Sequence, residues 1–499
     1  MARPPSPHVL FITLDQFRGD ALSSHGHPVV RTPNLDRLAD GGVRFSRHYT
    51  QSTPCAPGRA GLYTGMYQMN HRVVANGTPL DARFDNVAQL ARRAGREAFL
   101  FGYTDQSIDP RVATGSDDPR LDSYEGVLPG FESVLDNTGD QRPWLDFLAE
   151  SGHDVSRGHM HMLSTEHERP AEHGLSAFTT DRVVEFLRTR SGSDSPWFVH
   201  VSYLRPHPPY SAPGRFATMY SPATVGLPIE PAAERHPFHD VLMALDEVRR
   251  PEGDEAMREV RAQYYGMVSA VDHEVGRLLD ALQEFGWFDD TIVVVTADHG
   301  EQLGDHGLLQ KVGWFEESHH IPLIWRDPRH PEAHGRVVTD FTESVDVMPT
   351  LADTWGEPVP LQCDGLPLTD FVRGGRPAWW RSAATWEFDW RFALIPWGDY
   401  EWPWDRRLES QHLTVRRSDD TAYVQFDDGS WLCFDLARDP TWRTPVTDPA
   451  RVLRSAQEML VWRSVHADRT HTGLLIEKGG IGRWPDGIPW RAQMTGSTS

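Results

Sequence analysis

The segment from Thr53 to Arg59 holds the residues best suited to do chemistry. Cys55, Pro57 and Arg59 form a Cys-x-Pro-x-Arg pattern at a predicted helix start. Proline suits the first turn of a helix, and the charge of Arg59 would lie beside the amide-rich, positive end. The pattern therefore predicts an anion site next to a thiol. Taken alone, Cys55 has a commoner interpretation, because free cysteines are usually small buried apolar side chains.

Two further pairs of residues offer ligands for a metal ion. Asp15-Gln16 follows the first apolar run, and Asp298-His299 follows a late one. Together they supply two carboxylates, an amide oxygen and an imidazole. Carboxylate and amide oxygens suit hard cations, and the imidazole widens the choice toward Mn²⁺ or Zn²⁺. An aspartate at a strand end is more often a helix cap, so the metal hypothesis depends on both pairs meeting Cys55 in space.

Alternating strands and helices must position these residues. We predict strands at 8–14, 43–49, 98–101, 197–203 and 291–296, and helices at 33–39, 86–94, 179–188 and 255–285. Helices between apolar strands imply an α/β fold with a mostly parallel sheet. Ligands of such sheets collect beyond the carboxyl ends of the strands. Asp15, Tyr103, His207 and Asp298 would all be delivered there.

The 499 residues fit one large α/β domain and a smaller one. We expect a catalytic domain over residues 1–377, in which the weakly periodic residues 107–173 form an insertion or lid. Short strands at 379–394, 412–417, 422–427 and 430–435, followed by a helix at 449–465, indicate an antiparallel sheet in a C-terminal subdomain over 378–469. Residues 470–499 would form an extended tail that could pack on another subunit.

Composition argues against several kinds of partner. Lys and Arg number 49 and Asp and Glu number 71, so the net charge of −22 disfavours nucleic acid and anionic membranes. We find no apolar run near the ~18 residues that a membrane helix needs, and no signal peptide. Cys55, Cys363 and Cys433 cannot form a disulfide framework. We therefore expect a cytoplasmic protein.

Longer motifs make the chain resemble the sulfatase branch of the alkaline phosphatase superfamily. The Cys55 segment resembles its first signature, although Gly58 stands where Ser, Thr or Ala is more usual. Residues 296–307 with Lys311 resemble its second signature, and residues 434–440 resemble a segment of its smaller domain. The resemblance implies that a formylglycine-generating enzyme oxidises Cys55 to formylglycine, which becomes the nucleophile. It also implies one divalent cation, Mn²⁺ or Ca²⁺ ahead of Zn²⁺ or Mg²⁺, bound by Asp15, Gln16, Cys55, Asp298 and His299.

Finer features resemble one subgroup, the phosphonate monoester hydrolases. Gln16 and His299 stand where many sulfatases have Asp and Asn, and residues 69–81, 102–111 and 205–210 also resemble that subgroup. This resemblance implies hydrolysis of phosphonate monoesters and phosphate diesters, with promiscuous action on sulfate monoesters. The alternatives are an aryl or carbohydrate sulfatase and an inactive sulfatase-like binding protein. Joint retention of the predicted ligands, Arg59 and Lys311 speaks against the inactive protein.

The resemblance also assigns roles around a small anionic ester substrate. Arg59 would stabilise the nucleophile, while Lys311 and His207 would hold non-bridging oxygens or assist the leaving group. Asn76 and Tyr103 would donate hydrogen bonds to the substrate. Asp105 would face the substrate, where its charge would disfavour dianions. Relatives in the subgroup are often tetramers, so we expect a homo-oligomer, either tetramer or dimer.

Overall fold

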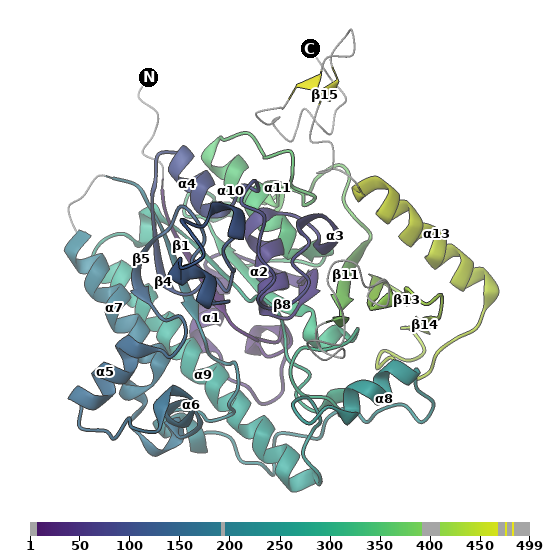
Figure 1. The fold of residues 1–499 in the computed structure, drawn as a ribbon, viewed down its shortest axis with the longest axis horizontal. Helices are drawn as coiled ribbons and strands as arrows, with labels where there is room; N and C mark the ends of the chain where they lie inside the picture. The colour runs from purple at the N-terminus through teal and green to yellow at the C-terminus, as the bar shows by residue number, and fades with distance from the viewer. Residues whose placement is uncertain (1–6, 191–194, 392–409, 468–474, 477–481, 484–499) are drawn as a thin grey trace.

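A nine-stranded sheet forms the centre of the part of the chain that the structure describes (Figure 1). This computed structural model describes residues 7–190, 195–391, 410–467, 475–476 and 482–483. The strand order is β10 (Thr342–Glu343), β2 (Val43–Tyr49), β8 (His320–Arg326), β7 (Thr291–Thr296), β1 (His8–Leu14), β6 (Trp197–Tyr203), β4 (Glu97–Gly102) and β5 (Glu132–Asp136), with β9 (Arg336–Val338) beside β2. Among these strands β8 alone runs antiparallel to its neighbours. The predicted mostly parallel sheet is confirmed.

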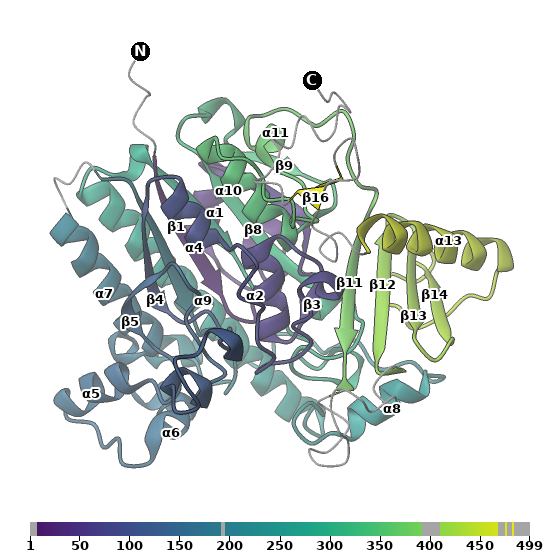
Figure 2. The same cartoon turned by 45° about the horizontal axis from the view of Figure 1, so that its top comes forward.

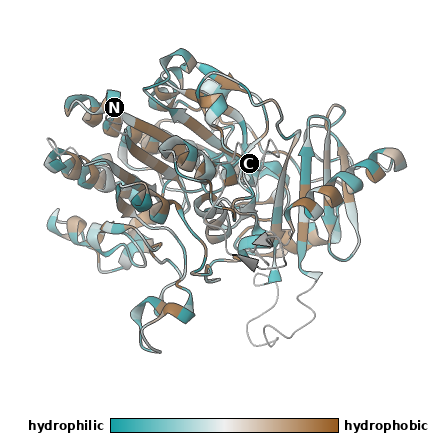
Figure 3. Cartoon of the chain, turned by 90° about the horizontal axis from the view of Figure 1, so that it is seen from above, coloured by the Kyte–Doolittle hydropathy of each residue, from teal (hydrophilic) through white to brown (hydrophobic). Residues whose placement is uncertain are grey.

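Helices cover both faces of this sheet. Leu10 and Ile12 of β1 pack into one core layer, and Val9 and Phe11 pack into the other, as the alternation of side chains along a strand requires. The first layer contains α1 (Pro33–Asp40), α5 (Arg142–Glu150), α6 (Gly158–Ser164), α7 (Leu175–Arg190) and α9 (Asp254–Glu284), and the second contains α2 (Cys55–Thr64), α4 (Val87–Arg93), α10 (Val347–Trp355) and α11 (Thr369–Val372). Figure 3 shows the apolar strands, in brown, enclosed between these helices. Burial on both faces explains the nearly continuous apolar strands.

The topology brings the predicted strand ends together. β7, β1, β6 and β4 are consecutive neighbours, and all of their pairings are parallel. Their carboxyl ends therefore lie along one edge of the sheet. Asp298, Asp15, His207 and Tyr103 follow these four ends in that order. The prediction that one region collects these residues is confirmed.

Residues 107–173 contain more regular structure than their weak periodicity suggested. Strand β5 pairs in parallel with β4 and forms one edge of the main sheet. Trp144 and Leu148 of α5 and Leu163 of α6 are buried in the core beside α7. This part of the segment is therefore integral to the α/β core, and its local sequence hid this because the apolar side chains meet partners far away in the chain.

A second sheet lies beside the first, toward the right of Figure 2, and one of its faces carries α13 (Pro449–His466). Its order is β14 (Trp431–Asp435), β13 (Thr421–Phe426), β12 (His412–Ser418), β11 (Ala383–Asp389) and β3 (Ser52–Thr53). The strands β11 to β14 are antiparallel, as predicted. In contrast, β3 runs parallel to β11 and immediately precedes the Cys55 helix, so the smaller sheet is fastened to the catalytic segment.

Other predicted parts of the chain differ in extent from the structure. The strand expected at 379–394 begins at Ala383, and residues 392–394 lie outside the described residues. Most of the tail at 470–499 also lies outside them, apart from the paired β15 (Leu475–Ile476) and β16 (Gly482–Arg483). Two short helices, α3 (Gln68–His71) and α8 (Pro237–Ala244), complete the fold. Among the described helices, none combines the length and the apolar character needed to cross a membrane.

Candidate active site

Cys55 occupies the first position of α2 and is buried. Both backbone polar groups of the next residue, Ala56, are held by side chains from other segments. The Ala56 N–H donates to Asn76 Oδ1 at 2.9 Å, and Gln106 Nε2 donates to the Ala56 carbonyl at 2.8 Å. The first N–H groups of a helix have no partner within the helix, so these contacts fix the turn that carries Cys55.

Gly58 lets α2 pack closely against the backbone of Asp298, one of the predicted metal ligands. A Cβ at position 58 would lie 2.6 Å from the Asp298 carbonyl oxygen and 2.9 Å from the Ser52 carbonyl oxygen. Both are backbone atoms, so neither can swing away. The departure of Gly58 from the usual family pattern therefore has a local reason, which is the close packing of α2 on the segment after β7.

Four predicted ligands converge in a buried cluster. One ligand atom each from Asp15, Cys55, Asp298 and His299 can be chosen so that all four lie within 4.8 Å of one another. His299 Nε2 is 3.2 Å from Cys55 Sγ and 3.6 Å from Asp298 Oδ2. His299 Nδ1 lies 3.0 Å from the Gly300 carbonyl and must carry the proton to donate to it. The lone pair on Nε2 therefore faces the cluster.

The donor set fits a divalent cation. Asp15 Oδ1 is buried and accepts no hydrogen bond from the described residues, although a buried carboxylate oxygen normally needs a partner. Burial, with Lys311 nearby, lowers the pKa of His299, so its imidazole is neutral and able to ligate. Carboxylate oxygens with one imidazole suit ions such as Mn²⁺. A cation at this position would satisfy Asp15 Oδ1.

Gln16, the fifth predicted ligand, lies at the same edge and is fixed at both ends. Its Oε1 accepts a hydrogen bond from Lys311 Nζ at 2.8 Å, its Nε2 donates to Glu301, and its backbone N–H donates to Asp298 Oδ1 at 3.1 Å. The amide oxygen thus points toward the Lys311 ammonium. Its role as a metal ligand stays a prediction.

Arg59 is completely buried and contacts two of the candidate ligands. Its Nε donates to Asp298 Oδ2 at 2.8 Å, its Nη2 donates to Asp15 Oδ2 at 3.1 Å, and its Nη1 donates to Ser202 Oγ at 2.8 Å. Its guanidinium also lies over the Tyr103 ring, 4.4 Å from the centroid. The structure therefore makes Arg59 a residue that orients and neutralises the carboxylates.

Tyr103 and Asn76 already have hydrogen-bond partners. The Tyr103 hydroxyl donates to Asp15 Oδ2, and the Asn76 carboxamide oxygen accepts from Ala56. Each contact positions a residue of the cluster. The exposed Asn76 keeps its amide N–H groups for a further acceptor, so substrate binding by either residue stays a prediction.

Lys311 and His207 lie close to the cluster. Lys311 is buried, contrary to the solvated position that a lone lysine would favour. Burial lowers the pKa of Lys311, but Cys55, Asp15 and Asp298 outweigh it and raise the pKa above its ordinary value. His207 is half-buried, and its Nδ1 is 2.7 Å from the Pro208 carbonyl. Burial and the Lys311 charge lower the pKa of His207 to about 3, so its free nitrogen is an acceptor.

Asp105 is a buried acid near the cluster, with a carboxylate oxygen that is unpartnered among the described residues. It is buried, adopts a left-handed backbone conformation with φ of 55°, and its Oδ1 has no hydrogen-bond partner among the described residues. Burial raises the pKa of Asp105 to about 7, with Arg59 opposing that shift. Its charge also raises the pKa of Cys55, after the larger effects of burial and Asp15. Asp105 therefore acts electrostatically on the nucleophile position.

Comparison with known proteins agrees with this geometry. The family profile described as Sulfatase matches residues 7–357, and one described as N-sulphoglucosamine sulphohydrolase, C-terminal, matches residues 304–460. The chain belongs to the sulfatase family. It is 36% identical over 506 residues to the multifunctional alkaline phosphatase superfamily protein PehA of Trinickia caryophylli, with 93% of this chain and 96% of that protein covered.

Solved structures extend the family likeness to the whole fold. The phosphonate monoester hydrolase of Agrobacterium radiobacter is 39% identical with a TM-score of 0.87, covering 96% of this chain and 100% of that one. The phosphonate monoester hydrolase of Silicibacter pomeroyi is 33% identical with a TM-score of 0.85, covering 96% and 99%. Membership of the sulfatase family and these neighbours place the protein among the ester hydrolases.

Three supporting residues of this sulfatase-family site were not predicted from the sequence. Glu301 accepts a hydrogen bond from the Gln16 side chain. It also accepts from the backbone N–H groups of Leu303 and Gln310, at 2.7 Å in both cases. Ser202 binds Arg59, and Gln106 binds Ala56. Glu301 lies inside the second signature, and Ser202 is a polar residue near the end of a buried strand, so both left a sequence signal. Gln106 left none.

Proposed function

We propose that this protein hydrolyses phosphonate monoesters and phosphate diesters, and promiscuously sulfate monoesters, with formylglycine made from Cys55 as nucleophile. The observation that carries the proposal is the buried cluster of Asp15, Cys55, Asp298 and His299, in which Asp15 Oδ1 has no hydrogen-bond partner among the described residues. The choice of phosphorus esters is supported by the similarity to PehA and to two phosphonate monoester hydrolases along almost the whole chain.

The electrostatics of Cys55 favour a modified nucleophile. Burial and the nearby Asp15 raise the pKa of the Cys55 thiol well above its ordinary value. A cysteine that attacks directly needs a lowered pKa, because the thiolate is the reactive form. Without a metal cation beside it, the unmodified side chain therefore stays a protonated thiol. A formylglycine hydrate, by contrast, supplies a hydroxyl whose proton a bound divalent cation makes easier to remove.

Other residues of the site would bind the cation and stabilise the charge of the ester. Asp15, Gln16, Asp298 and His299 would hold the cation together with the modified residue 55, and Mn²⁺ or Ca²⁺ fits the oxygen-rich set better than Zn²⁺ or Mg²⁺. Arg59 pairs with both carboxylates, Asp15 and Asp298, and orients them. Lys311 provides a buried positive charge for the non-bridging oxygens of the ester, a stabilisation that is strongest away from water.

His207, Asn76 and Asp105 would complete the substrate site. The amide N–H groups of Asn76 would donate to ester oxygens. His207 can donate to a non-bridging oxygen or to the leaving group only when its free nitrogen is protonated, a form that the negative charge of a bound ester favours. Tyr103 acts through Asp15. Asp105 provides a negative group next to the reacting centre, which favours monoanionic esters over dianionic ones.

A sulfatase acting on aryl or carbohydrate sulfates is the second candidate. The specific observation behind it is the family profile over residues 7–357, together with 28% identity to the arylsulfatase of Clostridium perfringens across 75% of this chain. An inactive binding protein is a weaker candidate, because the metal ligands, Arg59 and Lys311 are arranged together in one buried site.

We also propose the biological setting. A formylglycine-generating enzyme would act on Cys55 during maturation. None of Cys55, Cys363 and Cys433 forms a disulfide in the described part of the chain, which supports a reducing, cytoplasmic location. We further propose a homo-oligomer, tetramer or dimer, and neither nucleic acid nor membrane as partner, in keeping with the net charge of −22.

The test is a substrate panel on protein of known formylglycine content. Conversion of Cys55 lowers the mass of its peptide by about 18 Da, so peptide mass spectrometry gives the converted fraction. The kcat/KM values of matched nitrophenyl esters of a phosphonate, a phosphate diester and sulfate are then compared, with the Cys55→Ala protein as background. We expect the phosphorus esters to react faster. A large preference for the sulfate ester would establish the sulfatase alternative instead.

A further inference from the structure

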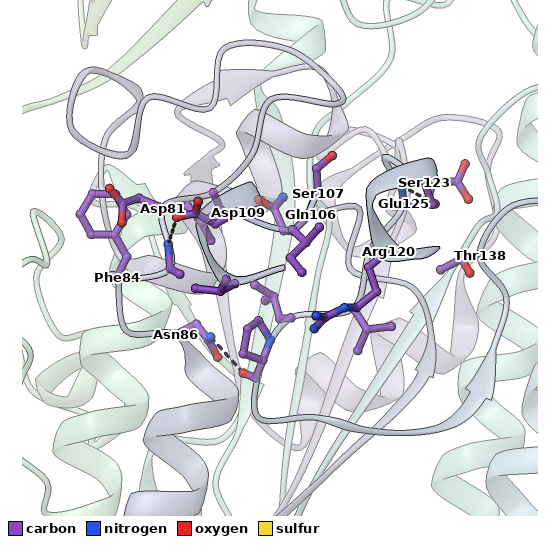
Figure 4. A pocket seen from close by; sticks show the side chains of 18 of the residues that line it. Asp81, Phe84, Asn86, Gln106, Ser107, Asp109, Arg120, Ser123, Glu125 and Thr138 are labelled. Atoms are coloured by element: carbon purple, nitrogen blue, oxygen red, sulfur yellow. Dashed lines mark hydrogen bonds between the residues drawn. The ribbon is translucent and has the colours of Figure 1, made fainter. Parts of the chain in front are cut away.

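A cavity of about 500 Å³ lies beside the Cys55 turn, and its lining contains Gln106 but none of the predicted metal ligands. Residues 80–89, 106–112, 119–129, 136 and 138 contribute its lining. Figure 4 shows Asp81, Phe84 and Asn86 on one side of it and Ser123, Glu125 and Thr138 on the other. Small-molecule sites in proteins occupy about 300–1,000 Å³, so this cavity has the size of a ligand site.

Most charged side chains of the lining have partners among the described residues, whereas the buried Gln106 Oε1 has none there. Asp81 pairs with Arg83 at 2.8 Å and with Arg111 at 3.0 Å. Arg120, the one cation among the lining residues, pairs with Asp118 at 2.6 Å. Asp109 pairs with Arg111 at 2.6 Å, while Asp136 and Glu125 accept hydrogen bonds from Thr138 and from the Gly139 N–H. An entering anion would meet these four carboxylates and a single arginine that already pairs with Asp118.

Apolar side chains make up much of the remaining wall, among them Leu80, Ile108, Val112, Val127 and Leu128. Val112 is 49% exposed, a high value for a valine at the edge of a cavity. A cavity with apolar walls, four carboxylates and one already paired cation favours a neutral apolar molecule over an anion. It therefore differs chemically from the cationic site around Lys311.

The cavity is lined in part by the segments that contact the first turn of α2, which carries Cys55. Gln106 lines the cavity and donates to the Ala56 carbonyl. Leu80 lines it four residues after Asn76, which accepts from the Ala56 N–H. A molecule wedged between these segments would press on both contacts of Ala56, and a small displacement of a nucleophile costs much of the rate.

We propose that this cavity, which we call the Val112 pocket, is an accessory site for a neutral apolar small molecule, and that its occupancy shifts the Cys55 turn through Gln106 and the Asn76 loop. Binding at the pocket does not depend on the proposed function. The effect on catalysis rests on it.

The probe for binding is N-phenylnaphthylamine, a neutral molecule whose fluorescence rises in apolar surroundings. We expect saturable binding at one site per chain, in both converted protein and the Cys55→Ala variant. Val112→Trp fills the mouth of the pocket and should weaken binding at least tenfold. Ile108→Asp, which places a charge in the wall, should do the same. The matched control is Val134→Trp on β5, since Val134 is 42% exposed and lies outside the lining.

The effect of pocket occupancy on the Cys55 turn is measured in two ways, one of which needs no enzymatic activity. A failure of the coupling can then be told apart from a failure of the proposed function. One is the alkylation rate of unmodified Cys55, followed by peptide mass, with and without the probe. The other is kcat on a small ester. We expect both to change at least twofold in wild type and in Val134→Trp, and neither in Val112→Trp.

Absence of saturable binding, or equal binding by Val112→Trp and Ile108→Asp, would overturn the proposed pocket. Binding that leaves both the alkylation rate and kcat unchanged would overturn the coupling. A probe that raises KM without changing kcat would show that the cavity belongs to the substrate path, and the accessory assignment would then be wrong.

Discussion

Two buried groups of charges in this molecule look alike in composition and differ in function. The catalytic cluster consists of Asp15, Cys55, Arg59, Asp298 and His299. The Arg381 cluster consists of Tyr67, Glu343, Asp346 and Arg381, and it joins the segment after α2 to the start of the smaller sheet. Each holds one arginine between two carboxylates.

The difference lies in the hydrogen bonds of the carboxylate oxygens. In the Arg381 cluster, Glu343 accepts from Tyr67 at 2.6 Å and from the Thr385 N–H at 2.9 Å, and both oxygens of Asp346 accept from Arg381. In the catalytic cluster, Asp15 Oδ1 has no partner among the described residues. A fully satisfied buried network is structural, whereas an unsatisfied oxygen in such a network marks the position of a missing ligand.

The largest effect should come from Asp15→Asn. The amide oxygen can keep the contacts with Arg59 and Tyr103, while the NH₂ group occupies the position of the unpartnered oxygen. We expect kcat/KM to fall by about 10⁴-fold and bound metal, measured by mass spectrometry of the purified protein, to fall with it. The melting temperature without added metal should fall by several degrees, because Arg59 keeps only Asp298 as an ionic partner, but the protein should stay folded since no packing is lost.

A variant that keeps both its metal and its activity would contradict the assignment of Asp15. Asp272→Asn is the matched control, because Asp272 is also buried but contacts Asn34 and Leu35 far from the site. That variant should retain metal and activity.

The second largest effect should be on stability alone. Arg381→Met leaves Glu343 and Asp346 as buried carboxylates without their cation, which costs about 3–5 kcal/mol of unfolding free energy. Urea titration measures this loss. The kcat of the folded fraction should stay within about threefold of wild type, because the cluster touches none of the candidate ligands. If Arg381→Met lowers kcat and leaves the unfolding free energy unchanged, the Arg381 cluster is not a purely structural group.

The sequence was most informative where function depends on position along a strand. Asp15 and Asp298 were predicted as ligands because each follows a buried strand, and neighbouring parallel strands share an edge. The partners of Arg59 were not predicted, since its direction depends on where Asp298 and Ser202 arrive in space. Neither was β3, a two-residue strand whose partner β11 lies more than three hundred residues away in the chain.

A third prediction concerns His412, a titratable group of the smaller sheet. Its Nε2 is 3.2 Å from Glu387 Oε1, and its Nδ1 is 3.5 Å from Asp427 Oδ2. Burial lowers the pKa of His412, but the two carboxylates outweigh it and raise the pKa to about 9.

Because the folded-state pKa exceeds the ordinary value of about 6.5, the stabilisation is fully present below that pH and is lost as pH rises through about 9. His412→Gln should therefore lower the unfolding free energy by about 2–3 kcal/mol at pH 6 and by much less at pH 10. Denaturant titrations across this range provide the measurement. An unfolding free energy difference that stays constant with pH would exclude a charged His412 in the folded protein.

The smallest expected effect is on the preference between substrates and concerns Asp105, whose Oδ1 also has no hydrogen-bond partner among the described residues. Unlike Asp15 it has no arginine hydrogen bond among the contacts of the described residues, and burial raises the pKa of Asp105 to about 7. The ionised Asp105 carboxylate repels a phosphate monoester dianion more strongly than a phosphate diester monoanion. Asp105→Asn should therefore raise the ratio of kcat/KM for the monoester to kcat/KM for the diester by about tenfold, which corresponds to about 1.4 kcal/mol. The ratio is measured at pH 8, where the wild-type carboxyl is mostly ionised, and Asp272→Asn serves again as control. If the ratio stays constant while both kcat/KM values fall together, Asp105 acts on the turn that carries Cys55 and not on the charge of the substrate. The unpartnered oxygen of Asp105 would then help to position the nucleophile and would not discriminate between substrates.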